Sequence, residues 1–210
     1  MRKEKITSQE LKRLIALKAN KLSYDDVSEE DFDEITELVL KSTTFNGENT
    51  GIDLNCIVLF PNIERLRVIG FDIEQEVIDV FANQLRLHGV EFSKCKMGKV
   101  SFEGLNGRLK RVDFTECGRL DFKYPEVQNI NVVSSEVDFN NIDFEKVKGI
   151  SIIDSVIRNG KSLTEFENIE RVVLDGTKIY AGDEEKTDIE VSKNTKYSHK
   201  KEVELVDIER

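Results

Sequence analysis

The chain has 210 residues, of which 39% are hydrophobic and 34% are charged, and its formal net charge is −10. A chain of this length buries roughly 70% of its unfolded surface on folding, so a core forms without disulfides or metals and extensive disorder is excluded. The negative charge disfavours nonspecific binding of the whole surface to nucleic acid or anionic membrane, because both are polyanions.

The sequence has no apolar stretch of about 18 residues, and no apolar segment follows the charged residues 1–5. We therefore expect neither a membrane span nor a secretory signal, and a cytoplasmic location. The three cysteines, Cys56, Cys95 and Cys117, are odd in number and widely spaced. This predicts reduced, buried thiols rather than a disulfide framework.

Residues 1–34 have the pattern of a helical N-terminal cap. Thr7-Ser-Gln-Glu10 resembles a capping box, and the apolar stripe behind it predicts a helix over about 8–19. The stripe consists of Leu11, Leu14, Ile15 and Leu17. We expect this segment to cover the apolar end of the array that follows, which water would otherwise reach.

From residue 35 onward the pattern apolar-x-x-apolar-x-apolar recurs. Its full matches are Ile35/Leu38/Leu40, Ile63/Leu66/Val68, Leu109/Val112/Phe114, Val127/Ile130/Val132, Val147/Ile150/Ile152 and Ile169/Val172/Leu174. Two partial matches, Leu85-Arg-Leu87 and Val100-Ser-Phe102, keep only the last step. In several copies a further apolar residue follows five positions later, as Ile73 follows Val68.

Each copy predicts a short strand with one buried face, because apolar and variable residues alternate. A unit this short cannot bury its apolar side alone, so neighbouring units must stack as parallel strands around a continuous core. We predict an α/β solenoid, a right-handed coil with a parallel β-sheet on its concave face and short helices or turns outside. The spacing leaves room for a helix at 74–83 and only for turns between 87 and 114. A more general β-solenoid is the alternative.

This repeat resembles that of the leucine-rich repeat family, L-x-x-L-x-L, over residues 35 to about 180. Val27-Ser28-x-x-Asp31-Phe32, ahead of Ile35, is similar to the helical N-terminal cap of internalin-like bacterial members of that family. The resemblance implies a divergent bacterial array. The chain departs from the family where a buried Asn or Cys is expected three residues after the last strand leucine. In the predicted frame these positions hold Thr43, Phe71, Val90, Cys117, Ser135, Ser155 and Thr177.

Residues 181–210 change to charged and polar clusters. Within them, Ile189-Glu-Val191 and Val203-Glu-Leu205 predict two capping strands, with a mobile loop near 192–201. A disordered interaction tail is the alternative. The predicted organisation is a cap at 1–34, an array at 35–180 and a C-terminal segment at 181–210, forming one continuous structural unit.

The sequence shows no arrangement typical of an active site or a metal centre. The two histidines, His88 and His199, have no cysteine or second histidine at metal-ligand spacing, and no C-x-x-C occurs. Gly160-Lys161-Ser162 imitates the end of a phosphate-binding loop, but Ser155 stands where that loop needs glycine. We predict no catalytic residue, no cofactor and no metal. A site of paired carboxylates stays open, because carboxylates are plentiful.

Variable side chains of the predicted strands project from the concave face. Basic residues cluster there on an acidic protein: Arg65, Arg67, Arg86, Lys99 and Arg111, with His88 at the edge. Arginine suits bidentate contact with carboxylate or phosphate and is enriched in binding hot spots. The uncharged, partly apolar end of the face holds Asn131, Val133 and Ile153. Together these residues are the predicted partner-binding site.

The alternative is that the basic stems only cover the sheet and pair with Glu37, Glu103 and Asp113. The predicted architecture and the lack of recognisable chemistry favour a non-catalytic protein-binding module, such as a regulator, an inhibitor or an immunity-type protein. Its partner would be a protein, with an acidic surface or itself a nucleic-acid-binding enzyme. No membrane partner is predicted, and the chain alone is expected to be a monomer.

Two other functions stay open at the level of the sequence. The basic cluster could bind nucleic acid or another polyanion, although no aromatic residue is interleaved with it to stack on bases. A hydrolase with paired carboxylates is the less favoured hypothesis, because a shallow solenoid face rarely provides a deep pocket.

Overall fold

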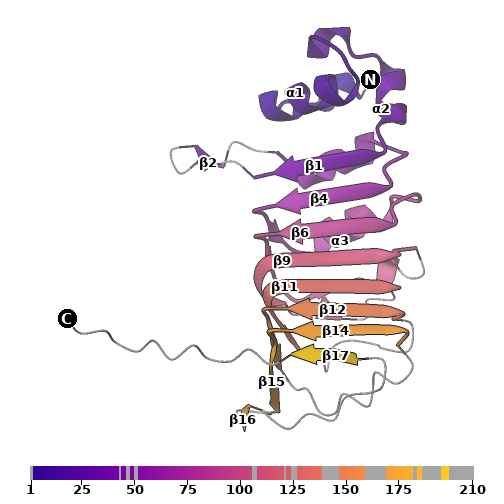
Figure 1. Cartoon of the computed structure of the whole chain (residues 1–210). Coiled ribbons are helices and arrows are strands. Elements are labelled where there is room, and N and C mark those ends of the chain that lie inside the picture. The colour runs from indigo at the N-terminus through magenta and orange to yellow at the C-terminus, as the bar shows by residue number, and fades with distance from the viewer. Residues whose placement is uncertain are drawn as a thin grey trace, which may run out of the picture.

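Stacked parallel strands form the main sheet of the protein. The computed structural model describes residues 2–42, 44–45, 48–49, 52–105, 108–120, 122–123, 127–138, 147–158, 169–181, 184–185 and 195–198. Within them the main sheet has the order β1 (Glu37–Lys41), β4 (Arg65–Ile69), β6 (Gly89–Ser93), β9 (Arg111–Leu120), β11 (Asn129–Asp138), β12 (Gly149–Ile153), β14 (Arg171–Asp175) and β17 (Thr195–Ser198). Figure 1 shows these strands one below another, which confirms the predicted parallel-sheet solenoid.

The strands form where the repeat alternates apolar and variable residues. In β4, Leu66 and Val68 are at most 2% exposed, whereas Arg65 and Arg67 are exposed. All apolar residues of the six full matches are buried. Neighbouring strands pair residue for residue, so that Leu66 lies beside Leu38 on one side and Val90 on the other. A slip of one residue would turn this whole row to solvent, which fixes the register.

The third strand of the main sheet lies at other residues than the predicted frame gave it. The partial matches around residues 85–87 and 100–102 are not strands of the main sheet; β6 instead covers Gly89–Ser93. Its apolar residues Leu87, Val90 and Phe92 are buried and satisfy the full pattern. Val100–Ser101 forms β8, which pairs with β10 (Phe122–Lys123) outside the main sheet.

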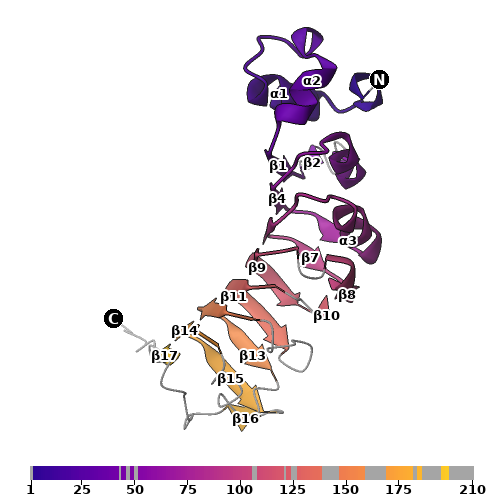
Figure 2. The same cartoon turned by 90° about the vertical axis from the view of Figure 1, so that its right-hand side faces the viewer.

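Short elements cover the other side of the core. They are β5 (Asp72–Ile73), β7 (Lys96–Met97), β13 (Val156–Arg158), β15 (Lys178–Ala181), β16 (Glu184–Glu185), the helix α3 (Gln75–Ala82) and the 3₁₀ helices η3 (Leu54–Leu59) and η4 (Glu103–Leu105). Figure 2 shows α3, β7, β8 and β10 together on this outer side. The predicted helix at 74–83 is confirmed, and its Phe81 ring lies 6.4 Å from that of Phe92 in β6. A small hairpin, β2 (Thr44–Phe45) with β3 (Glu48–Asn49), follows β1.

From the second coil onward, the chain bends through a residue with left-handed backbone, two positions after the last buried residue of the repeat pattern. The φ angles there are positive at Gly70, Lys94, Glu116, Ser134, Asp154 and Gly176, between 48° and 76°. This conformation costs an L-residue roughly 1–2 kcal/mol, and glycine escapes most of that cost. The bends therefore hold strain in four of these coils and relieve it with glycine in two.

At five of these six bends, from Lys94 onward, the next residue is one rung of a buried polar ladder between coils. Its rungs are Cys95, Cys117, Ser135, Ser155 and Thr177. The Ser135 hydroxyl accepts from the Cys117 amide at 3.0 Å and donates to the Val133 carbonyl at 2.9 Å. The next rung repeats the pattern, since the Ser155 hydroxyl accepts from the Ser135 amide at 3.2 Å. Cys95, not Val90, holds this position in the third coil, so the ladder is more regular than the sequence frame predicted.

Helices precede the first strand. The helix α1 spans Gln9–Lys18 and α2 spans Glu29–Glu34, with 3₁₀ turns η1 (Lys3–Lys5) and η2 (Tyr24–Asp26) beside them. Figure 1 shows α1 and α2 beyond β1, at the end of the sheet. The N-cap of α1 is Ser8, whose hydroxyl accepts from the Leu11 amide at 3.3 Å, and not the predicted Thr7. The predicted boundaries 1–34, 35–180 and 181–210, and the family origin of the cap, stay predictions.

The C-terminal prediction is only partly within the described residues. Both predicted capping strands, at 189–191 and 203–205, lie outside them. Thr195–Ser198, which the sequence placed in a mobile loop, instead forms β17 and pairs in parallel with β14. The open edge of β14 offers unpaired backbone groups, which explains why a polar segment is recruited there. In the described part of the chain, no helix is long and apolar enough to span a membrane.

Candidate functional site

The open face of the main sheet is the surface made by the side chains that alternate with the buried rows. In register order, its middle row is Val39, Arg67, Glu91, Asp113, Asn131, Ser151 and Val173. The row on the N-terminal side of the strands is Glu37, Arg65, Gly89, Arg111, Asn129, Gly149 and Arg171. The row on the C-terminal side is Lys41, Ile69, Ser93, Thr115, Val133, Ile153 and Asp175.

The structure brings six of the nine predicted site residues onto this face: Arg65, Arg67, Arg111, Asn131, Val133 and Ile153. It does not place Arg86, His88 or Lys99 there. Arg86 and His88 precede β6, and the His88 Nδ1 lies 3.2 Å from the Arg86 carbonyl oxygen. Lys99 is exposed just before β8, in the outer layer. Arg86 and His88 were misplaced because the frame of the third coil was shifted, and Lys99 was misplaced because Val100-Ser-Phe102 was taken for a strand of the main sheet.

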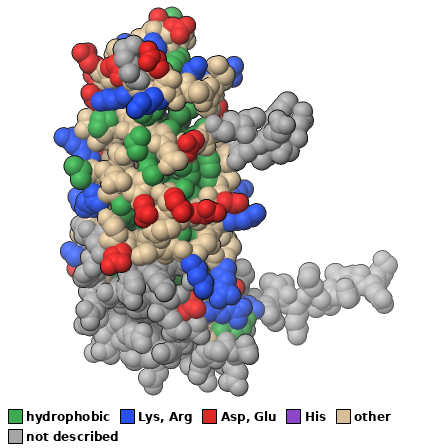
Figure 3. Space-filling model, turned by 180° about the vertical axis from the view of Figure 1, so that it is seen from behind, with side chains coloured by type: hydrophobic (Ala, Val, Ile, Leu, Met, Phe, Trp, Pro, Cys, Tyr) green, Lys and Arg blue, Asp and Glu red, His purple; other side chains and the backbone are tan. Residues whose placement is uncertain are grey.

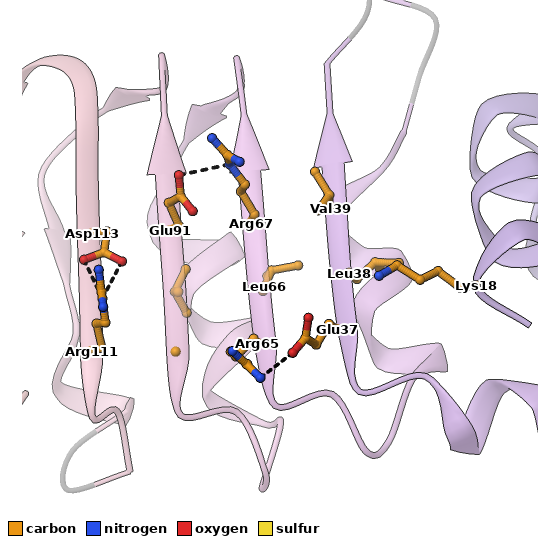
Figure 4. Close-up of a pocket in the computed structure, with 12 residues that line it drawn as sticks. Lys18, Glu37, Leu38, Val39, Arg65, Leu66, Arg67, Glu91, Arg111 and Asp113 are labelled. Atoms are coloured by element: carbon orange, nitrogen blue, oxygen red, sulfur yellow. Dashed lines mark hydrogen bonds and ion pairs between the residues drawn. The ribbon is translucent and has the colours of Figure 1, made fainter.

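Acidic residues interrupt the predicted basic cluster. Arg65 pairs with Glu37 at 2.5 Å, and Arg67 pairs with Glu91 at 2.9 Å. The Arg111 Nε lies 2.7 Å from a carboxylate oxygen of Asp113 on its own strand. Figure 4 shows these pairs side by side across β1, β4, β6 and β9. This part of the face is therefore a mosaic of opposite charges, as the alternative reading of the sequence expected.

Glu91 is the residue of this mosaic that the sequence interpretation missed. It occupies the middle-row position between Arg67 and Asp113 that the predicted frame gave to Arg86. The signal was present in the sequence, because Leu87-His-Gly-Val90-Glu-Phe92 fits the full repeat pattern and places Glu91 between two buried residues.

Two neighbouring hollows follow the open face. The first has a volume of about 370 Å³ and is lined by the mosaic together with Lys18 from α1. The second, of about 430 Å³, is lined by Arg111, Asn129, Asn131, Gly149, Ile150, Ser151 and Arg171. Arg111 belongs to both, so the two hollows adjoin. No carboxylate is among the described residues that line the second hollow.

The two apolar residues of the predicted site, Val133 and Ile153, lie side by side on the open face, at the end that also carries Arg171 and Asp175. Val133 and Ile153 are paired neighbours on β11 and β12, and both side chains are half-buried. The most exposed large hydrophobic residues of the described chain lie elsewhere, at Leu22 (105%), Leu85 (80%) and Leu17 (73%). Figure 3 shows acidic and apolar side chains interspersed on the outer face.

The thiols are poor candidates for chemistry. Burial, with a smaller contribution from the Asp53 carboxylate, raises the pKa of Cys56 to about 12. Burial also raises the pKa of Cys95 and of Cys117. A thiol must ionise to act as nucleophile or metal ligand, so these groups stay unreactive near neutral pH. Among the described residues, no three His, Cys, Asp or Glu side chains are grouped so that they could hold a metal ion.

The neighbouring carboxylates Glu91 and Asp113 are the arrangement closest to a carboxylate pair on the open face. They lie opposite each other on β6 and β9, and each is bound to an arginine. Both hollows are partly open to solvent. The arrangement can hold a partner by ion pairs, amide hydrogen bonds and half-buried aliphatic contacts.

Comparison with known proteins adds little to this description. No protein-family model matches the chain. No curated protein matches its sequence. Among solved structures, an internalin C2 from Listeria monocytogenes is similar at 16% sequence identity and a TM-score of 0.47, covering 84% of this chain and 87% of that one. Both values are low, so the fold stated above rests on the strand order and register of the chain itself.

Proposed function

We propose that the protein is a non-catalytic binding module that holds a protein partner on its open face. The observation that carries the proposal is the uninterrupted register of the open face from β1 to β14, with two adjoining hollows. The opposite side of the same sheet packs into the core, so only this side presents its strand residues to a partner.

The chemistry of the face suits a protein surface. Interfaces combine polar groups with apolar contacts, and they are enriched in arginine. The open face combines ion-paired arginines on β4 and β9 with the half-buried Val133 and Ile153 on β11 and β12. We propose Arg65, Arg67, Arg111, Asn131, Val133 and Ile153 as contact residues. A regulator, an inhibitor or an immunity-type protein would each use such a face, and the chain would act as a monomer.

The test is capture of a partner from nuclease-treated extract of cells that produce the protein naturally, using wild type, Val39→Glu and Leu85→Glu. Val39 lies in the middle row of the face and is 40% exposed, whereas Leu85 is 80% exposed outside it. We expect a partner that Leu85→Glu retains and Val39→Glu loses. Of the two variants, only Val39→Glu adds a negative charge to the first hollow. Equal capture by the three proteins, or loss with both variants, would contradict the proposal.

Binding of nucleic acid by the predicted five-residue basic cluster is not proposed. Two of its members, Arg86 and Lys99, lie off the face, and the other three are paired with carboxylates. A polyanion laid along the first hollow would meet Glu37, Glu91 and Asp113. Repulsion by these groups would offset the contacts to the arginines.

A further inference from the structure

The described lining of the second hollow carries two positive side chains on an acidic protein. Its described lining includes two arginines, two asparagines and a serine, and no carboxylate is among these described residues, although the chain carries a net charge of −10. The first hollow, by contrast, contains Glu37, Glu91 and Asp113. The two halves of the open face therefore offer different chemistry to one partner.

The arginine and asparagine side chains of this hollow carry more N–H groups than their hydrogen bonds within the described chain use. Arg171 is exposed, and its guanidinium makes no ion pair with the part of the chain that the structure describes. Arg111 is engaged with Asp113 only through its Nε. The Asn129 Nδ2 donates to the Lys110 carbonyl at 3.3 Å, and the Asn131 Nδ2 donates to Asp113. Each amide nitrogen carries a second N–H, so both can also donate to an anion.

Gly149 keeps the floor of the hollow clear. It lies between Asn129 and Arg171 in the N-terminal row, where any other residue would place a side chain. A Cβ at this position would lie 2.6 Å from the Asn129 Oδ1. Glycine thus lets the Asn129 amide lie across the row and leaves space between the two arginines.

We infer that the second hollow binds acidic side chains of an extended segment of the protein partner, an inference that rests on the proposed function. Arg111 and Arg171 are three strand spacings apart in one row. Three spacings of about 4.8 Å give roughly 14 Å, the length of about four residues of extended chain. Residues i and i+4 of an extended segment point to the same side, so a segment with two carboxylates at this separation fits both arginines.

A protein segment fits better than a nucleic acid. The rows of the open face from β1 to β14 contain no aromatic side chain on which a base could stack. A continuous phosphate backbone leaving the second hollow towards β6 would meet Asp113 and Glu91. A short acidic segment ends at Arg111 and so avoids Glu91. It meets Asp113 only where that carboxylate is already bound by Arg111 and Asn131.

The probe for the test is a blocked peptide, acetyl-Gly-Glu-Ser-Gly-Ser-Glu-Gly-amide, titrated into the ¹⁵N-labelled full chain at low salt. We expect saturable shifts of the Asn129 and Asn131 side-chain amides and of the Arg171 Nε–H. Removing one charged donor by Arg171→Gln should weaken binding ~10-fold. The matched control is Arg65→Gln, which removes an arginine of the first hollow that is already paired with Glu37. It should change the affinity less than about 2-fold.

Several results would overturn the inference. These are an absence of shifts at the second hollow, equal binding of the peptide with Gln in place of both Glu, or equal weakening by Arg65→Gln. Tighter binding of an oligothymidylate at the same signals would overturn the choice of a protein segment. If Arg171→Gln retains a partner that Val39→Glu loses, the acidic-segment inference fails and the proposed function stands. Peptide binding at the hollow, together with capture that Val39→Glu leaves unchanged, would overturn the proposed function and leave only the affinity of the hollow for carboxylates.

Discussion

The bend residues illustrate how single backbone angles shape this protein. Gly176 has a φ of +59°, and a Cβ there would lie 2.6 Å from the Asp154 Oδ1. Ser134 has a φ of +49° at the equivalent bend two coils earlier and is exposed. The same backbone position is thus relaxed in one coil and strained in another.

We expect opposite effects from exchanging these residues. Gly176→Ala should lower the free energy of unfolding by at least about 1–2 kcal/mol, because it adds left-handed strain and a close contact. Ser134→Gly should raise it by about 0.5 kcal/mol, since relief of strain exceeds the entropy that glycine adds to the unfolded chain. Urea unfolding with unchanged m-values measures both. Equal signs for the two variants would contradict the assignment of strain.

The polar ladder gives a second prediction at this scale. Ser135→Ala removes the acceptor of the buried Cys117 amide and should cost about 1–3 kcal/mol of stability, the usual penalty for a buried donor left without a partner. Ser134→Ala, one residue earlier, is the control and should be close to neutral, because Ser134 is exposed. Urea midpoints of the two variants test this. Similar losses for both would show that the rung contributes nothing specific.

At the scale of elements, the short helix α2 depends on its capping box. The Asp31 carboxylate accepts from the Ser28 amide at 2.6 Å and from its hydroxyl at 2.9 Å, and the Asp31 amide donates to that hydroxyl at 3.2 Å. The two hydrogen bonds that the carboxylate accepts lower the pKa of Asp31, and the one from the Ser28 amide contributes more than the one from the hydroxyl. Two hydrogen bonds from the backbone amides of Arg2 and Lys3 likewise favour the ionised form of Glu29, and its pKa is lowered.

The sign of the pH dependence follows from these lowered pKa values. A carboxyl group whose folded pKa lies below its unfolded value of about 4 contributes stability above that value, and this contribution is lost as the pH falls through the folded pKa. Asp31→Asn should therefore be less stable than wild type at pH 7, with the difference narrowing below pH 4. Thermal unfolding from pH 7 to pH 2 measures it, with exposed Asp26→Asn as control. A constant difference would contradict the assignment.

The sequence predicted most strands because the pattern and the burial requirement coincide in six coils. It failed in the third coil, where Leu85-Arg-Leu87 imitates the last step of the repeat and diverts the frame from Leu87-His-Gly-Val90-Glu-Phe92. The error moved Arg86 onto the face and Glu91 off it, so the charge of the face was predicted wrongly. Ion pairs such as Arg67 with Glu91 join residues of different coils, and only a correct register in both coils reveals them.

At the scale of the whole molecule, each coil is supported by its neighbours. Ile130 is 1% exposed and packs between the equivalent residues Val112 and Ile150. Ile130→Asp should cost more than about 4 kcal/mol and unfold the adjoining coils, because it buries an unpaired carboxylate. Arg67→Glu, on the open side of the sheet, should cost less than about 1 kcal/mol. Circular dichroism melting compares them, and the reverse ranking would require a register shifted by one residue.

From the third coil onward, the bend residue and the ladder residue recur at fixed positions after the repeat pattern, so a deletion across them must remove one whole coil. Removal of residues 133–152 would join Val132 to Ile153 and bring Asp154 and Ser155 to the positions of bend and rung. Removal of one residue more or fewer would put the wrong residue at both positions. Across the strand, bend and rung, the insertions and deletions that such a chain tolerates are therefore whole coils. Gain or loss of a coil would widen or narrow the open face by one strand.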